Sequence, residues 1–162
     1  MNAPIFAAFS QNIATGNGVY HHDRPMFPSP KTTTAPAESG SSGRKFRVLY
    51  ADDMAELRKL LDIGLTRTGH HIDCVANGQD AANKVAAAPD DYDVVITDHH
   101  MPVMNGLELV RHLRTLPYRG KILIFSSELS SAVDDAYRQL KVDHILQKPI
   151  YLSQLYALLA KF

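Results

Sequence analysis

Two unbroken apolar runs, residues 94–96 and 122–125, limit what this chain can fold into more than any other feature. A strand with one face in solvent alternates apolar and polar residues, so an unbroken run indicates a strand covered on both faces, as in a parallel sheet. Amphipathic stretches separate such runs. In one of them, Leu57, Leu60, Leu61 and Leu65 follow the spacing of a helix with one buried stripe. The alternation predicts an α/β fold.

The same patterns divide the chain into elements. Strands are predicted at 46–51, 71–75, 93–97, 121–126 and 143–147, and helices at 54–67, 79–87, 106–115, 130–139 and 151–161. Five strand–helix units of this length predict one doubly wound domain over residues 44–162, a five-stranded parallel sheet with helices on both faces.

Residues 1–43 differ in composition, because they hold most of the prolines and many Ser, Thr, Gly and Asn residues. Such a segment buries little apolar surface, so we expect a disordered N-terminal tail or linker. The alternative is a partner-binding segment around Ile5, Phe6 and Phe9.

The overall composition excludes several classes of function. Lys and Arg together number 17, Asp and Glu number 17, and the formal net charge is zero. This balance gives no reason to expect binding to nucleic acid or to an anionic membrane. No apolar run approaches the length of a membrane span, and no basic residue precedes the mildly apolar start. The single cysteine, Cys74, fits a reducing compartment, so we expect a cytoplasmic protein.

Polar side chains follow several of the predicted strands at the point where each strand ends. Asp52 and Asp53 follow the first strand, Asp98 the third, Ser126 ends the fourth, and Lys148 follows the fifth. In parallel sheets these ends share one edge, where ligands of open α/β folds bind. Three clustered carboxylates repel one another without a cation, and Mg²⁺ prefers oxygen ligands. The sequence therefore predicts a Mg²⁺ site that accepts a phosphoryl group.

Simpler interpretations exist for each residue. Asp52 and Asp53 could begin a helix as capping residues, and Asp98 could be an ordinary turn acid. Lys148 could be a solvated lysine and Ser126 an ordinary loop serine. Two histidine pairs, His70-His71 and His99-His100, raise a transition-metal site as a further alternative. No phosphate-binding glycine loop occurs, which argues against a nucleotide enzyme.

Taken in order, these elements resemble the receiver domain of bacterial two-component response regulators, of the chemotaxis-regulator type. The resemblance extends over about residues 45–162. It depends on Asp52-Asp53, Asp98, Met101-Pro102 with Asn105-Gly106, Ser126, and Lys148-Pro149. The family implies a flavodoxin-like sheet with strand order 2-1-3-4-5, the order that a family member exemplifies for doubly wound folds.

The resemblance also implies a role for each residue. Asp98 would be the phosphoacceptor, and Asp52, Asp53, Asp98 and the main-chain carbonyl of His100 would bind Mg²⁺. Lys148 and Ser126 would contact the phosphoryl oxygens. Pro149 fits the family's frequent cis peptide bond after the lysine.

Some positions depart from the family pattern. The family usually has an aromatic residue three positions before the lysine, where this chain has Ile145, so a different output mechanism is expected. The small residues usual before it are replaced by Lys141-Val142. His100 and Glu128 stand where family members tune hydrolysis of the acyl phosphate.

The sequence thus predicts a phosphoryl-accepting signalling module that is not a classical enzyme. Its expected partners are a histidine kinase or histidine phosphotransfer protein, and a downstream protein that binds the face formed by residues 127–162. Phosphorylation could also drive dimerisation. Because the chain ends after the fifth helix, output is expected through protein contact or through phosphotransfer. The start at Met1 favours a stand-alone receiver; the alternatives are the terminal receiver of a hybrid histidine kinase and a phosphorylation-independent pseudo-receiver.

Overall fold

A computed structural model describes residues 43–127 and 130–162 of the chain. The predictions for the N-terminal tail, for Ile5, Phe6 and Phe9, and for Glu128 fall outside these residues.

Strands and helices alternate along the whole of the described chain. The elements are β1 (Arg47–Ala51), α1 (Ala55–Arg67), β2 (His71–Val75), α2 (Gly78–Ala87), β3 (Val94–Asp98), α3 (Gly106–Leu113), β4 (Lys121–Ser126), α4 (Ser131–Gln139), β5 (His144–Gln147) and α5 (Leu152–Leu159). All ten were predicted from the sequence, with ends that differ by two residues or fewer. Asp98 is the last residue of β3, where the prediction had placed it just beyond the strand.

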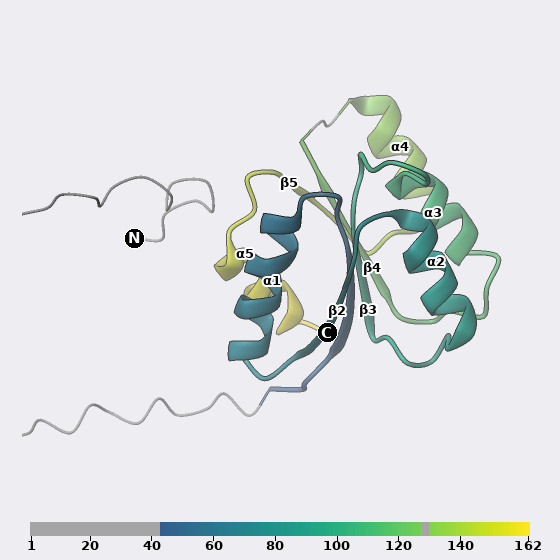
Figure 1. The fold of residues 1–162 in the computed structure, drawn as a ribbon. Helices are drawn as coiled ribbons and strands as arrows, with labels where there is room; N and C mark the ends of the chain where they lie inside the picture. The colour runs from purple at the N-terminus through teal and green to yellow at the C-terminus, as the bar shows by residue number, and fades with distance from the viewer. Residues whose placement is uncertain (1–42, 128–129) are drawn as a thin grey trace, which may run out of the picture.

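The strands form one parallel sheet in the order β2-β1-β3-β4-β5. Helices α1 and α5 cover one face of the sheet, and α2, α3 and α4 cover the other (Figure 1). The doubly wound fold and its strand order are therefore confirmed. The order reverses between β1 and β3, which places the crevice of the fold above the carboxyl ends of these two strands.

Two apolar clusters fill the space between the sheet and its helices. Leu49 and Ala51 face the cluster under α2, α3 and α4, while Val48 and Tyr50 face the cluster under α1 and α5. All five residues of β3 are buried, including residues 94–96, whose burial the unbroken apolar run predicted. Each fully buried Leu or Ile contributes about 1.5–3 kcal/mol relative to an exposed one, so these clusters hold the strand ends in place.

Several helix ends are fixed by local hydrogen bonds. The side chain of Asn77 accepts from the backbone N–H of Asp80 at the start of α2. Asn105 and Glu108 form a reciprocal capping box at the start of α3. These caps satisfy N–H groups that the first turn of a helix leaves without partners, and they set where the loops at the sheet edge begin. Within the described residues, no helix combines the length and apolar character needed to cross a membrane.

Candidate functional site

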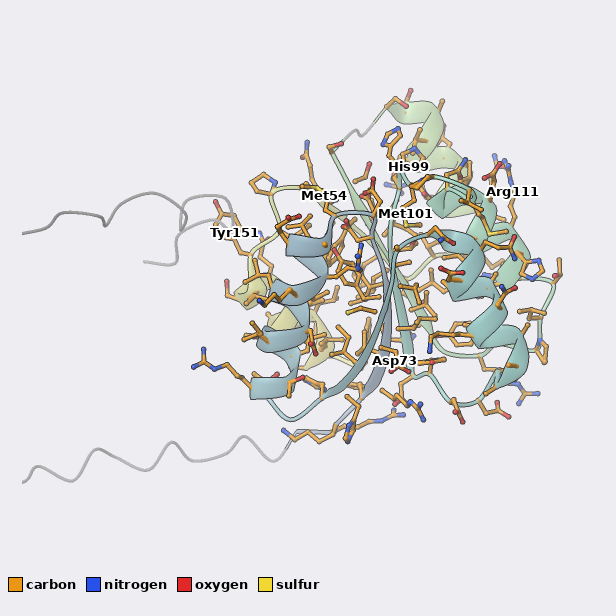
Figure 2. All side chains as sticks on the ribbon, in the orientation of Figure 1. Met54, Asp73, His99, Met101, Arg111 and Tyr151 are labelled. Carbon is orange, nitrogen blue, oxygen red and sulfur yellow. The ribbon has the colours of Figure 1, made fainter. Side chains whose placement is uncertain are left out.

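The carboxyl ends of the strands bring the predicted site residues together. Ala51 pairs with Thr97, Asp98 with Phe125, and Ser126 with Gln147, so the residues that end or follow β1, β3, β4 and β5 lie along one edge. Met54, His99 and Met101 lie around this end of the sheet, and Asp73 lies toward the other end (Figure 2). The convergence predicted for Asp52, Asp98, Ser126 and Lys148 is present.

Lys148 joins the two buried acids. Its Nζ lies 2.8 Å from Oδ1 of Asp98 and 3.2 Å from Oδ2 of Asp52. Burial opposes the charge on this ammonium group, but the hydrogen bond with Asp98 and the charges of both acids outweigh it and raise the pKa of Lys148. The lysine is 18% exposed and is therefore not a solvated strand-end residue. The Lys148–Pro149 peptide bond is cis, as expected.

Asp52 is fully buried and has hydrogen-bond donors on both carboxylate oxygens. The Tyr50 hydroxyl donates to Oδ2 over 2.6 Å, and the backbone N–H of Met54 donates to Oδ1 over 2.9 Å. Arg58 donates to the main-chain carbonyl of Asp52 over 2.6 Å and so holds the β1–α1 loop. The N-cap residue of α1 is Met54, so the capping interpretation of Asp52 and Asp53 is wrong.

The remaining predicted residues differ in exposure. Asp98 is 6% exposed and Ser126 is fully buried, whereas Asp53 and the side chain of His100 are exposed. The backbone N–H of Lys148 donates to the carbonyl of Ser126 over 2.8 Å, which ties the end of β4 to the end of β5. Asp53 alone among the three acids therefore presents its side chain to solvent.

The loop after β3 turns back closely over Asp98. The backbone N–H of Gly106 donates to the carbonyl of His99 over 3.0 Å. A Cβ atom at Gly106 would overlap the carbonyl oxygen of Asp98, so this position requires glycine. The Asn105-Gly106 pair thus has a structural reason: the first residue caps α3 and the second allows the close approach.

The site contains two tyrosines that the sequence analysis did not identify. Tyr50 of β1 reaches Asp52, and Tyr137 of α4 reaches the residue after Asp98: its hydroxyl lies 2.7 Å from Nδ1 of His99. Tyr137 is fully buried, and burial together with the charge of Asp98 raises the pKa of its hydroxyl. In the sequence both tyrosines occupy apolar positions of a strand or an amphipathic helix, so the pattern alone indicates core residues.

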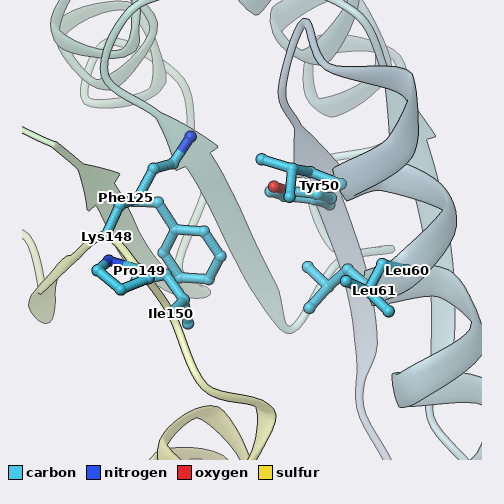
Figure 3. A pocket seen from close by; sticks show the side chains of 8 residues that line it. Tyr50, Leu60, Leu61, Phe125, Lys148, Pro149 and Ile150 are labelled. Carbon is cyan, nitrogen blue, oxygen red and sulfur yellow. The ribbon is translucent and has the colours of Figure 1, made fainter. Parts of the chain in front are cut away.

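A small apolar cavity adjoins the site on the α1 and α5 side. It measures about 30 Å³ and is lined by Tyr50, Leu57, Leu60, Leu61, Phe125, Lys148, Pro149 and Ile150. Figure 3 shows the Tyr50 ring from β1 facing Phe125 of β4, with the Lys148 amine directed away from the apolar lining. Apolar packing therefore fixes the Tyr50 ring below the acids.

The arrangement suits a hard cation better than a transition metal. Among the described residues, no three His, Cys, Asp or Glu side chains stand ready to hold a metal ion together. Asp52 and Asp98 are engaged with Lys148, and Mg²⁺ needs only one or two carboxylates besides waters and phosphate oxygens. His71 pairs with Arg47 at the amino ends of the strands, far from His99, so the histidine interpretation is wrong.

Comparison with known families identifies the fold's relatives. The family model for the response regulator receiver domain matches residues 48–160. The chain belongs to the response regulator receiver family. Members of this family are signalling phosphoacceptors of two-component phosphorelays, and that function fits this chain.

The relatives of this receiver include a protein much longer than the chain. The receiver is 33% identical over 121 residues to the sensory/regulatory protein RpfC of Xanthomonas campestris pv. campestris, an alignment that covers 72% of this chain and 16% of RpfC. The chain thus spans about a sixth of that relative's length.

Solved structures support the same fold. The chemotaxis protein CheY4 of Vibrio cholerae has a TM-score of 0.67 and 28% identity, over 73% of this chain and 98% of that one. The receiver domain of the sensor histidine kinase PA1611 of Pseudomonas aeruginosa, solved with a magnesium ion in its active-site cleft, has a TM-score of 0.65 and 20% identity, over 73% and 97% of the two chains.

Ile145 of this receiver lies half-buried in β5 and packs against the cluster under α2, α3 and α4. Tyr137 belongs to the same cluster and carries the polar link to the site. The aromatic residue near Asp98 is therefore supplied by α4, at a position that the family pattern did not indicate.

Proposed function

We propose that Asp98 of this receiver accepts a phosphoryl group from a phosphohistidine. The observation that carries the proposal is the position of its carboxylate, at the buried end of β3 and 2.8 Å from Lys148, which also holds Asp52. A carboxylate in this position is fixed and charge-compensated, yet its 9% side-chain exposure leaves an oxygen within reach of a donor.

The transfer is a single displacement at phosphorus. A carboxylate oxygen of Asp98 forms the new O–P bond as the P–N bond to the donor imidazole breaks, and the imidazole nitrogen keeps the electron pair. The product is an acyl phosphate. Lys148 then contacts a phosphoryl oxygen, and its ammonium group offsets the added negative charge. The Ser126 hydroxyl, at the end of β4, donates to a second phosphoryl oxygen.

The donor set fits Mg²⁺, as expected for a family whose receivers bind this ion in the active site. Asp53, Asp52, Asp98 and the main-chain carbonyl of His100 would hold it. When bound, the ion neutralises charge on the phosphoryl oxygens during the transfer. Oxygen ligands alone make up this set, which favours Mg²⁺ over softer metals.

Partners follow from the phosphoryl chemistry. The donor is a histidine kinase or a histidine phosphotransfer protein. The output is carried by a protein that binds the face of residues 127–162, and that protein can be a second copy of the receiver in a phosphorylation-linked dimer. Because the aligned segment makes up only 16% of RpfC, a receiver within a hybrid kinase is kept as the alternative to a stand-alone receiver. We infer a signalling phosphoacceptor in the cytoplasm that is not a classical enzyme.

Labelling by acetyl phosphate tests the assignment of Asp98. We expect intact-mass measurements to show one added phosphoryl group on the wild-type protein only when Mg²⁺ is present, and none on Asp98→Asn. Asp90→Asn, which changes an exposed acid in the α2–β3 loop, is the matched control and should label normally. Equal labelling of Asp98→Asn and wild type would refute the assignment.

A further inference from the structure

Tyr50 places a polar atom where its surroundings are otherwise apolar. The side chain is 2% exposed, and its ring lies 5.8 Å from that of Phe125, in the cluster under α1 and α5. Its hydroxyl lies 2.6 Å from Oδ2 of Asp52, the distance of a strong hydrogen bond to a charged acceptor. A valine or leucine would fill this strand position equally well without that bond. Packing alone therefore does not explain the hydroxyl.

The hydroxyl shares its acceptor with the lysine of the site. Oδ2 of Asp52 receives both the Tyr50 hydroxyl and Nζ of Lys148, whereas Oδ1 receives the backbone N–H of Met54. A carboxylate offers about four lone-pair positions, so these three donors leave about one for a cation or a water bound to it. Asp52 is thus held in one orientation before any ligand arrives.

Tyr50 cannot easily withdraw from this contact. The ring is 2% exposed and lies beside the ring of Phe125, with α1 residues and Ile150 nearby, so apolar packing holds it in place (Figure 3).

We propose that Tyr50 is a positioning residue that orients Asp52 for divalent-cation binding and thereby sets the Mg²⁺ affinity of the site. The proposal rests on the phosphoacceptor function proposed above. Without the hydroxyl, Oδ2 keeps only Lys148, at 3.2 Å, and the carboxylate can rotate. Lys148 would then be drawn toward Asp52 and away from Asp98. Loss of a hydrogen bond to a metal-binding side chain typically weakens affinity 10- to 100-fold.

The test is a Mg²⁺ titration of the full chain followed by NMR chemical shifts, with the metal alone as ligand. We expect Tyr50→Phe to raise the Mg²⁺ dissociation constant about tenfold. Tyr118→Phe is the matched control, because it also removes a buried tyrosine hydroxyl, one that donates to the carbonyl of Lys121 away from the acids. Its affinity should equal that of wild type.

Acetyl phosphate labelling separates positioning from a general structural effect. In Tyr50→Phe the Mg²⁺ concentration for half-maximal labelling should rise, while the rate at saturating Mg²⁺ stays near that of wild type. In an Asp52→Asn background the Tyr50→Phe substitution should no longer change Mg²⁺ affinity. A purely structural role would change the affinity in both backgrounds.

The outcomes distinguish the two proposals. If wild type neither binds Mg²⁺ nor labels, the proposed function fails; if wild type does both and Tyr50→Phe binds Mg²⁺ equally well, only the role of Tyr50 fails. Should Tyr50→Phe not fold, wild-type protein with labelled tyrosine rings decides the matter. Mg²⁺ must then shift the Tyr50 ring signals more than those of Tyr118, and equal shifts overturn the proposal.

Discussion

Replacing Lys148 with methionine removes the ammonium group that contacts both buried acids of the site. The lysine lies 2.8 Å from Asp98 and 3.2 Å from Asp52. Methionine has a similar length and no charge, so the change leaves two carboxylates facing each other without their shared cation. Asp52 is fully buried and the Asp98 side chain is 9% exposed, which leaves little water to replace the lysine.

The expected cost follows from burial. Removing one partner of a buried ion pair costs about 3–5 kcal/mol, because the remaining charge is uncompensated. We expect the lower end, about 3 kcal/mol, because Asp52 keeps the Tyr50 hydroxyl and the Met54 N–H as donors. With an unfolding entropy of about 2.1 cal/mol/K per residue, a domain of about 120 residues should lose about 12 °C in melting temperature.

The pH dependence has a definite sign. The folded-state pKa of Lys148 is raised above its ordinary value of 10.5, so its stabilising contribution is fully present below that pH. The contribution is lost as the pH rises through the folded-state pKa. The difference in unfolding free energy between wild type and Lys148→Met should therefore stay constant near neutral pH and shrink above about pH 10.5.

Thermal unfolding measured by circular dichroism provides the assay, and Lys121→Met provides the control. The Nζ of Lys121 lies 2.8 Å from Asp143, the same distance as that between Lys148 and Asp98, but the side chain of Lys121 is 48% exposed. Exposed pairs contribute about 0–1 kcal/mol, so Lys121→Met should be nearly neutral. Equal losses in the two variants would refute the argument from burial. Mg²⁺ should also stabilise Lys148→Met more than wild type, because it replaces the missing cation.

Two further predictions concern how phosphorylation reaches the surface. Phosphorylation, imitated by beryllofluoride, should change NMR shifts at Ser127 and Ser130 more than at Ile145; a dominant rotamer change at Ile145 would contradict this. Tyr137→Phe removes the hydroxyl that meets His99 and should cost about 1 kcal/mol in chemical unfolding. It should also reduce the beryllofluoride-induced shifts along α4, and unchanged shifts would show that the link carries no signal.

Much of the fold was predictable because it depends on patterns that are local in sequence. Residues 94–96 and 122–125 were predicted to be strands covered on both faces, and all of them are buried in the sheet. The position of Asp98 at a strand end then followed from parallel-sheet geometry. Leu107 shows the limit of such patterns: it is an apolar residue of α3, yet it is only half-buried, whereas Leu109, Val110 and Leu113 fill the core.

The two tyrosines of the site could not be predicted, because their role depends on where a hydroxyl ends and not on which face a ring covers. Tyr50 and Tyr137 fit apolar positions in a strand and a helix, and both rings are indeed buried. Their hydroxyls reach Asp52 and His99 only through the packing of separate elements. Sequence periodicity describes the ring of an amphipathic side chain well and its polar end poorly.

Phosphorylation of Asp98 would change the partners of the Lys148 ammonium group, which now contacts both Asp52 and Asp98. Lys148 would follow the phosphoryl oxygens, and Asp52 would keep its place through Tyr50 and Met54. The acid proposed to bind the cation would therefore stay fixed while the lysine moves. Ile145 has no polar atom in its side chain to sense this change. The hydrogen bond between His99, next to Asp98, and Tyr137 of α4 is a direct polar contact between the β3 end and the predicted output face, so the expected route of the signal runs through α4.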